Sequence, residues 1–400
     1  MRYTDIAIVG GGLAGSVAAA MLGRAGIATI VVDPHEIYPP DLRCEKLGGT
    51  QIPILRRTGL AEEVLRATTL DGEVWEARFG YVVDRKPSDQ YGIMYDTLVN
   101  TTRTLIPANV TTLHTKVTSV STSDERQKLT LAEGEDISAR LIVLANGLSV
   151  SLRDQLGLER RVISACHSVT LGFNVIPVGR PAFPFPALTY WPGRTSARMA
   201  YLTLFPIGNA MRANFMVYRP MDDVWFREFR EAPEAAMRAM MPGLARMAGD
   251  FKVDGQIKIR PADLYVTNGH RQHGVVVVGD AFSTSCPAAG TGTDKVFTDV
   301  ERLCNVHIPQ WLATEGMGRD KIEAFYDDPV KTACDAWSTA KAYHLRALYT
   351  DNGLSWRAKR WGRFVVRSCQ GIARQAKLLR SAKDPSSNMH GTESSQGKLA

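Results

Sequence analysis

Residues 4–15 read TDIAIVGGGLAG and decide the fold of the N-terminal part of the chain. The run 4–9 is mostly apolar and ends at a glycine, and the small residues of 13–23 have the composition of a tightly packed helix. A second apolar run, 28–32, stops at Asp33. A strand, a helix and a second strand within about 30 residues form a βαβ unit. The sequence therefore predicts an α/β fold that begins with this unit.

Three glycines of this stretch follow the pattern Gly10-x-Gly12-x-x-Gly15 between the first strand and the helix. The first permits a tight turn, the second lets the backbone approach a pyrophosphate, and the third lets helix and strand pack closely. The helix N-terminus adds free N–H groups and a positive partial charge. Asp33, at the end of the second strand, can accept hydrogen bonds from ribose hydroxyls. We expect an ADP-containing dinucleotide here; the alternative is a glycine-rich turn without a ligand.

A second glycine-bearing segment lies near residue 280. The apolar run 275–278 is followed by GDA (279–281), and PAAGTG (287–292) opens a helix. This order resembles the second FAD-binding motif of the para-hydroxybenzoate hydroxylase-like (group A) flavoproteins. In that family the aspartate, here Asp280, binds the ribityl chain, and the helix start, here 290–293, lies beside the flavin pyrimidine ring.

The chemistry of the second segment agrees with this resemblance. A reduced flavin carries negative charge near N1, and unpaired N–H groups at a helix start stabilise that charge without a side-chain cation. The alternative is a strand, turn and helix with a structural role only.

Two shorter segments resemble the same family. The apolar run 139–144 is followed by Asn146 and Gly147, where the family has an Asp-Gly pair. The family often has an arginine after the second strand that touches FAD; Arg43 is our first candidate for this residue and Lys46 the second.

The expected cofactor-binding residues combine all of these segments. They are Gly10, Gly12, Leu13, Ala14, Gly15, Asp33, Pro34, Arg43, Lys46, Val117, Asn146, Gly147, Asp280, Pro287, Gly290, Thr291, Gly292 and Thr293. The chain departs from the family at Tyr95, where the resemblance leads us to expect an arginine in a helix.

The resemblance implies a Rossmann-like, three-layer FAD-binding domain that is interrupted by a mixed β-sheet domain and followed by a helical C-terminus. We expect the discontinuous FAD domain to use 1–160 and 271–330. The substrate-binding sheet is expected over 161–270, C-terminal helices over 331–383, and a disordered polar tail over 384–400.

The implied function is that of an FAD-dependent monooxygenase, a hydroxylase. In the family NAD(P)H reduces FAD, dioxygen adds at flavin C4a, and the hydroperoxide delivers an oxygen atom to an aromatic or other electron-rich small molecule. Because the cofactor performs this chemistry, no catalytic side chain is named. A C=C reductase of the geranylgeranyl-reductase type would use the same FAD motifs. A flavin-dependent halogenase is disfavoured because the chain has no Trp-x-Trp-x-Ile-Pro segment. A flavin-holding protein without turnover is the non-enzymatic alternative.

The positive charge of the chain is concentrated near its C-terminus. The net charge is +7, and nine basic residues with no acid lie between Arg357 and Lys383. Apolar residues such as Trp361, Val365 and Ile372 alternate with them at helical spacing. We expect a helix packed on its own protein by its apolar face, with a solvated cationic face; contact with an anionic membrane surface is the alternative. No nucleic-acid recognition module is visible.

The remaining composition is that of an ordinary globular protein, with 44% hydrophobic and 22% charged residues. The six cysteines are widely spaced, and the eight histidines show no ligand spacing. We therefore expect reduced thiols, no metal site and a cytoplasmic protein, with peripheral membrane contact as the alternative. No run approaches the 18 apolar residues that a membrane-spanning helix needs.

Overall fold

The first of two β-sheets carries the glycine-rich turn. The computed structural model describes residues 1–383, and its first sheet has seven strands in the order β6-β2-β1-β9-β8-β7, with β15 also paired to β9. Its strands are β1 (Arg2–Val9), β2 (Thr29–Val32), β6 (Thr111–Leu113), β7 (Val117–Ser121), β8 (Gln127–Leu131), β9 (Asp136–Leu144) and β15 (Val275–Val277). Strand β1 runs parallel to β2 and β9, and β9 runs parallel to β15. The predicted α/β class is confirmed.

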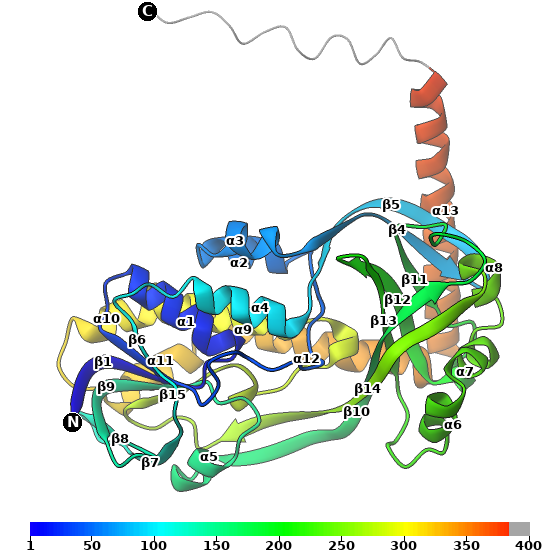
Figure 1. Cartoon of the computed structure of the whole chain (residues 1–400). Helices are drawn as coiled ribbons and strands as arrows, with labels where there is room; N and C mark the ends of the chain where they lie inside the picture. The colour runs from blue at the N-terminus through cyan, green and yellow to red at the C-terminus, as the bar shows by residue number, and fades with distance from the viewer. Residues whose placement is uncertain (384–400) are drawn as a thin grey trace, which may run out of the picture.

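The centre of this sheet is buried on both faces. Helix α1 (Leu13–Arg24) lies between α4 (Tyr95–Thr104) and α9 (Gly292–Arg302) on one side of the sheet (Figure 1). Ile6, Ile8 and Leu141 are fully buried. Continuous apolar runs are typical of parallel strands that are covered on both faces, and this is why the sequence pattern identified them.

The second sheet has eight strands in the order β14-β10-β13-β12-β11-β4-β5-β3. These are β3 (Lys46–Leu47), β4 (Thr69–Arg78), β5 (Tyr81–Gly92), β10 (Glu159–Pro177), β11 (Ala187–Trp191), β12 (Met199–Ile207), β13 (Ala210–Val217) and β14 (Phe251–Asn268). The long strands β10 and β14 pair antiparallel and run from the first sheet to the second (Figure 1).

The second sheet uses more of the chain than 161–270. Strands β3, β4 and β5 of this sheet come from residues that we assigned to the FAD domain. The hairpin β4–β5 carries Glu76 and Asp84, which are buried. Charged residues at buried positions remove the simple alternation of polar and apolar residues by which a half-buried strand is identified.

One face of the second sheet is covered by three short helices, α6 (Trp225–Glu231), α7 (Pro233–Met240) and α8 (Leu244–Ala248). Phe215, Trp225, Phe229 and Met237 belong to the apolar core between them and the sheet. Pro233 starts a new helix after α6, because proline lacks the N–H that a helix interior requires.

Two long helices end the described chain. Helix α12 (Pro329–Thr350) runs alongside α9, and α13 (Leu354–Lys383) stands beside β4 and β5 (Figure 1). The shorter helices are α2 (Gln51–Arg57), α3 (Ala61–Arg66), α5 (Ser151–Gln155), α10 (Ile308–Leu312), α11 (Arg319–Tyr326), η1 (Thr195–Ala197), η2 (Gly279–Ala281), η3 (Pro287–Ala289) and η4 (Leu303–His307). Among the described residues, no helix is long and apolar enough to cross a membrane. The tail expected to be disordered, 384–400, lies outside the described residues.

Helix α13 packs against the second sheet by arginines as well as by aromatic rings such as Phe364 on Phe79, whereas we expected only an apolar contact face. Arg367 forms an ion pair with Glu76 at 2.8 Å, and Arg374 pairs with Asp84 at 2.7 Å. Close approach is possible because Gly371 faces the backbone of β5, where a Cβ atom would lie 2.2 Å from the Val83 carbonyl oxygen. The apolar side chains Trp361, Val365, Val366 and Ile372 are more than half exposed. The buried carboxylates of the sheet determine this orientation, and they could not be foreseen from the helix sequence.

Candidate active site

The first glycine turn has the geometry that its pattern predicts. Gly10 has φ +104°, and a Cβ atom there would lie 2.5 Å from the Ala145 carbonyl oxygen. A Cβ on Gly15 would lie 1.8 Å from the Gly10 carbonyl oxygen. In contrast, a Cβ on Gly12 would meet nothing closer than the Tyr38 ring at 3.9 Å. Gly10 and Gly15 are therefore required by the protein itself, whereas the space at Gly12 is free for a ligand.

Helix α1 begins at this open space. Its N-cap is Gly12, and no side chain accepts a hydrogen bond from the first turn, which includes Leu13 and Ala14. Uncapped N–H groups at a helix N-terminus form an anion-binding site. The start of α1 can therefore hold a diphosphate.

Asp33, which follows strand β2, holds the glycine turn by a hydrogen bond. Its Oδ2 accepts the Gly11 N–H at 2.7 Å and its Oδ1 accepts the His35 N–H at 2.9 Å. A carboxylate has further lone pairs, so hydrogen bonds from ribose hydroxyls remain available. Pro34 follows as an exposed residue.

Sequence reasoning missed Arg103, at the end of α4. Its Nε donates to the Gly11 carbonyl at 2.8 Å and its Nη2 lies 3.1 Å from Asp33 Oδ1. The guanidinium therefore ties the glycine turn to the acidic strand end. No motif marks this residue, because only the packing of α4 against α1 brings it to the turn.

The second glycine segment also leaves a helix start open. Gly290 has φ +64° with nothing within 4 Å of a Cβ, and the nearest atom to a Cβ on Gly292 is Ser285 Cβ at 4.0 Å. Thr291 is the N-cap of α9 and no side chain caps the first turn, which contains Thr293. Pro287 begins the short helix η3 before it. The first turn of α9 can therefore donate N–H groups to a ligand.

Arg43 and Asp280, which we assigned separately to FAD binding, lie in contact with each other. The Arg43 guanidinium pairs with the Asp280 carboxylate and with Asp41 at 2.6 Å. Its Cζ lies 5.7 Å from the centre of the Tyr95 ring. The structure thus places the aromatic ring of Tyr95 against the cation that we assigned to FAD binding.

Asn146 lies against the first glycine turn, and its side chain makes no hydrogen bond to the described part of the chain. Its Cα would be 2.9 Å from a Cβ on Gly10, and neither its Oδ1 nor its Nδ2 makes a hydrogen bond although both are buried. Gly147 follows with φ +60°. Because buried polar atoms in native proteins are almost always bonded, Asn146 indicates a missing ligand at this place. Val117 is packed on the core of the first sheet at the start of β7.

Lys46 points to the second sheet. Its Nζ lies 4.7 Å from the centre of the Phe205 ring, and burial lowers its pKa. The neighbouring Cys44 Sγ lies 4.0 Å from Thr293 Oγ1 at the start of α9. The segment that contains both residues therefore connects the second glycine segment to the second sheet.

Asp71 is a buried carboxylate beside Lys46. It is 4% exposed, and neither of its oxygens has a hydrogen-bond partner. Burial raises the pKa of Asp71 to about 6, and the charge of Lys46 opposes this increase. No sequence motif marks Asp71, because a carboxylate near the start of a strand belongs to no recognisable pattern.

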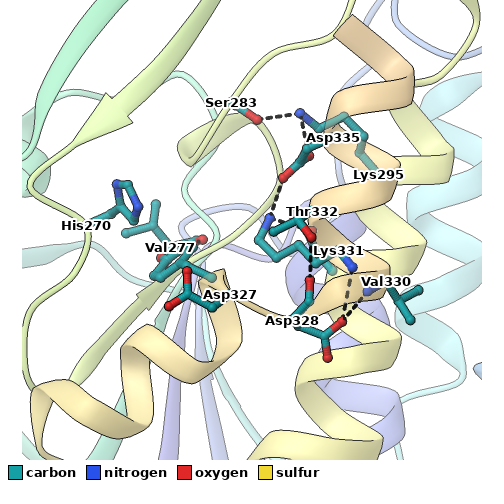
Figure 2. A network of polar contacts seen from close by, with 12 residues as sticks. His270, Val277, Ser283, Lys295, Asp327, Asp328, Val330, Lys331, Thr332 and Asp335 are labelled. Atoms are coloured by element: carbon teal, nitrogen blue, oxygen red, sulfur yellow. Dashed lines mark hydrogen bonds and ion pairs between the residues drawn. The ribbon is translucent and has the colours of Figure 1, made fainter. Parts of the chain in front are cut away.

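A buried network of charged side chains lies between α9 and α12 (Figure 2). Lys331 Nζ on α12 lies 2.9 Å from Asp299 and 3.0 Å from Asp335. Lys295 Nζ on α9 lies 2.9 Å from Asp335 and donates to Ser283 Oγ at 2.5 Å. The network joins α9, α12 and the segment between η2 and η3, so it fixes the helix whose start is open.

These residues fit a dinucleotide that carries a flavin. An extended polar site lies between the two glycine segments. It consists of the uncapped starts of α1 and α9, the Asn146 amide, which makes no hydrogen bond within residues 1–383, and the open space beside Gly12. Among the described residues no cluster of histidine, cysteine and carboxylates could hold a metal ion.

The fold and site define an FAD-dependent oxidoreductase. The family described as FAD binding domain matches residues 3–306, so the chain belongs to this family. It is a member of the para-hydroxybenzoate hydroxylase-like (group A) flavin monooxygenases, as the resemblance predicted.

Similar curated proteins are named as hydroxylases or monooxygenases. The chain is 24% identical to 3-demethoxyubiquinol 3-hydroxylase of Escherichia coli (strain K12) over 327 residues, 76% of this chain and 79% of the relative. It is 25% identical to a 3-amino-4-hydroxybenzoate 2-monooxygenase of Streptomyces platensis, over 75% of this chain and 78% of the relative. It is also 25% identical to kynurenine 3-monooxygenase of Salinispora arenicola (strain CNS-205), over 74% and 71%.

Solved structures show the same fold. p-Nitrophenol 4-monooxygenase PnpA from Pseudomonas putida DLL-E4 aligns with TM-score 0.73 and 16% identity, covering 96% of this chain and 98% of that chain. The flavin-dependent brominase Bmp2 aligns with TM-score 0.68 and 16% identity, covering 96% and 100%.

Proposed function

We propose that the protein is a monooxygenase that places one oxygen atom of dioxygen on an electron-rich aromatic ring, with NADH or NADPH as electron donor. The relatives named above support the ring substrate, since their printed names are those of hydroxylases and monooxygenases of ring compounds. The named substrates differ among the relatives, so the individual ring compound is left to experiment.

One contact between the glycine segments carries the proposal. A Cβ on Gly279, which has φ +62°, would lie 3.2 Å from the Cβ of Ala14. The first turn of α1 therefore lies directly beside the turn that carries Asp280. A single extended cofactor can then contact both turns, with its diphosphate at α1 and its ring end at α9.

Each part of FAD has a group on the chain suited to it. We assign the diphosphate to the N–H groups of Gly12, Leu13 and Ala14, the adenosine ribose to Asp33, and the ribityl chain to Asp280. The start of α9 would donate N–H groups to the pyrimidine ring. When bound, FAD supplies the transfer of electrons from the nicotinamide to dioxygen. The chain's own part is to orient the flavin, exclude water and position the substrate.

Asp71 is our candidate for the general base that accepts a proton from the substrate's hydroxyl or amino group. An aromatic ring with a hydroxyl or amino group becomes more electron-rich when a proton is removed from that group. Asp71 is buried, accepts no hydrogen bond within residues 1–383, and has a pKa that burial raises to about 6, which are properties suited to a general base. Lys46, beside it, would hold the negative charge of the deprotonated ring.

The test uses the purified holoprotein and a panel of phenols, aminohydroxybenzoates and quinols. We expect bound FAD in the absorbance spectrum, substrate-dependent oxidation of NADH or NADPH, equal consumption of dioxygen, and one ¹⁸O atom from ¹⁸O₂ in the product. Absence of oxygen incorporation with every compound would overturn the proposal.

Other outcomes would identify the alternatives. A halogenated product that depends on added bromide or chloride would identify a halogenase. Saturation of an alkene without dioxygen would identify a reductase, and FAD that no donor reduces would identify a binding protein. A cytoplasmic location and membrane contact through the C-terminal helix stay predictions that cell fractionation would check.

A further inference from the structure

The space between α13 and the second sheet is a small pocket with a large excess of positive charge. Its free volume is about 30 Å³. The polar side chains of the lining are those of Arg78, Arg360, Arg363, Arg367, Trp191, Tyr349 and Glu76. A position for a water molecule needs about 10–15 Å³, so the pocket admits a group of a few atoms and excludes an aromatic ring.

The one carboxylate of the lining, that of Glu76, already pairs with two cations. Glu76 lies 2.6 Å from Lys86 and 2.8 Å from Arg367. The other three arginines of the lining form no ion pair within the described part of the chain. Arg78 donates to the Pro192 carbonyl at 3.0 Å, and Arg360 donates to backbone carbonyls that include that of Leu348 at 3.0 Å. Carbonyl oxygens satisfy N–H groups but do not cancel full charges, so most of the positive charge is uncompensated.

Aromatic rings compensate only part of this charge. Arg367 lies 4.6 Å from the centre of the Trp191 ring, and Arg78 lies 5.2 Å from that of Phe364. Such cation–π contacts are each weaker than a charge-assisted hydrogen bond. Burial lowers the pKa of Arg78, and the nearby Arg360 and Arg367 lower it further. The arginines therefore repel one another across the pocket.

A second observation concerns an uncharged donor. The Trp191 Nε1–H, on the lining, is buried and makes no hydrogen bond of normal geometry within residues 1–383, although it lies near the Glu76 carboxylate. A buried donor without an acceptor costs free energy, which an acceptor atom inside the pocket would recover. The guanidinium groups and the indole together offer donors only.

We infer that this pocket binds a single oxyanionic group, a carboxylate or a phosphate. Arginine forks match both groups in geometry and charge, and an oxyanion would accept from Trp191 as well. Two sources have this chemistry: the acidic end of an organic ligand, and a free inorganic anion.

The pocket lies close to the predicted flavin site. Trp191 packs against Tyr201 at a ring distance of 5.3 Å, and the Tyr201 hydroxyl donates to the Ala288 carbonyl at 2.7 Å. Ala288 belongs to η3, directly before the open start of α9. One layer of aromatic rings therefore separates the pocket from the predicted flavin position.

The test measures binding to the oxidised holoprotein without turnover, so its outcome is independent of whether the proposed oxygenation occurs. Sodium sulfate, inorganic phosphate and acetate would be titrated by calorimetry at constant ionic strength, with chloride as the replaced anion. We expect saturable binding of at least one of the three.

Two variants distinguish the pocket from general attraction of anions. Arg363→Gln removes a charge from the lining, whereas Arg357→Gln removes the same charge from an exposed position on the same helix. We expect Arg363→Gln to weaken binding about tenfold or more, and Arg357→Gln to leave it unchanged. Trp191→Phe removes the indole N–H and should also weaken binding, which gives a second variant if Arg363→Gln does not fold.

The results separate the sources as well. Binding of acetate without phosphate would assign the pocket to a carboxylate of an organic ligand, and binding of phosphate or sulfate would assign it to a phosphate group or a free inorganic anion. No saturable binding of any anion, or equal binding by wild type and both pocket variants, would overturn the inference.

Discussion

Lys331 Nζ lies 2.9 Å from Asp299 Oδ1, and both side chains are almost completely buried. The pair joins α12 to α9, and Asp335 and Lys295 extend it to Ser283 (Figure 2). Two cations and two carboxylates balance one another in an interior where an unpaired charge is costly. The helix that starts beside the expected flavin is thus held by charges as well as by apolar packing.

The first prediction concerns the stability of this network. Lys331→Met removes one cation and leaves Asp299 and Asp335 with insufficient positive charge, so we expect a loss of about 3–5 kcal/mol in the free energy of unfolding. Urea denaturation of the holoprotein, followed by circular dichroism, would measure it. Lys341→Met, on the exposed side of the same helix, is the control and should change stability by no more than about 0.5 kcal/mol. Equal effects of the two variants on the free energy of unfolding would show that the network does not stabilise the fold.

The second prediction separates cofactor binding from folding. Gly12→Ala adds a methyl group that meets no protein atom closer than 3.9 Å, so the apoprotein should keep its stability. If the diphosphate approaches Gly12, the methyl group should weaken FAD binding by about 1–3 kcal/mol, roughly 5- to 150-fold in Kd. Fluorescence titration of apoprotein with FAD would measure the Kd. Gly362→Ala is the control, because that glycine lies on α13 with nothing within 4 Å of a Cβ. An unchanged Kd for Gly12→Ala would contradict the assigned position.

The third prediction follows from the pKa of Asp71. Burial raises this pKa from 3.8 to about 6, so the folded state binds the proton more tightly than the unfolded state. Ionisation of Asp71 therefore destabilises the fold progressively as pH rises from about 4 to 6, by up to about 3 kcal/mol. Asp71→Asn should be more stable than wild type at pH 7.5 and equally stable below pH 4. Thermal unfolding of both proteins across this pH range would test the prediction; a constant difference at all pH values would refute it.

The fourth prediction concerns turnover. If the Asp71 carboxylate accepts a proton from the substrate, kcat/KM should fall as pH decreases through about 6. Asp71→Asn should remove this dependence and lower kcat/KM by about 100-fold or more. The FAD content should stay at the wild-type level, which separates loss of a base from loss of the cofactor. A wild-type pH profile in the variant would rule out this role.

Local patterns predicted the parts of the fold that depend on neighbouring residues. The turn Gly10–Gly15 was predictable because φ +104° at Gly10 and the approach of Gly15 to the Gly10 carbonyl follow from backbone sterics alone. The strand before Gly279 was predictable because it is continuously apolar, as a strand buried on both faces must be.

Features that depend on distant partners were not predictable. Arg103 reaches Gly11 and Asp33 only because α4 packs beside α1. The hairpin β4–β5 was missed because its buried Glu76 and Asp84 have their partners on α13, almost 300 residues later. The same partners bring arginines of α13 against the sheet, where we expected only apolar contacts. Asp71 has no sequence signal, since its raised pKa comes from burial in the folded protein.

The inward-facing arginines of α13 have a consequence for handling the protein. Sodium chloride screens ion pairs such as Arg374–Asp84, whose arginine side chain is 37% exposed, whereas it does not screen apolar contacts. Concentrated sodium chloride should therefore release the C-terminal helix and make it a substrate for trypsin, because its many lysines and arginines would then be accessible. Storage buffers of low ionic strength should keep this segment attached and intact.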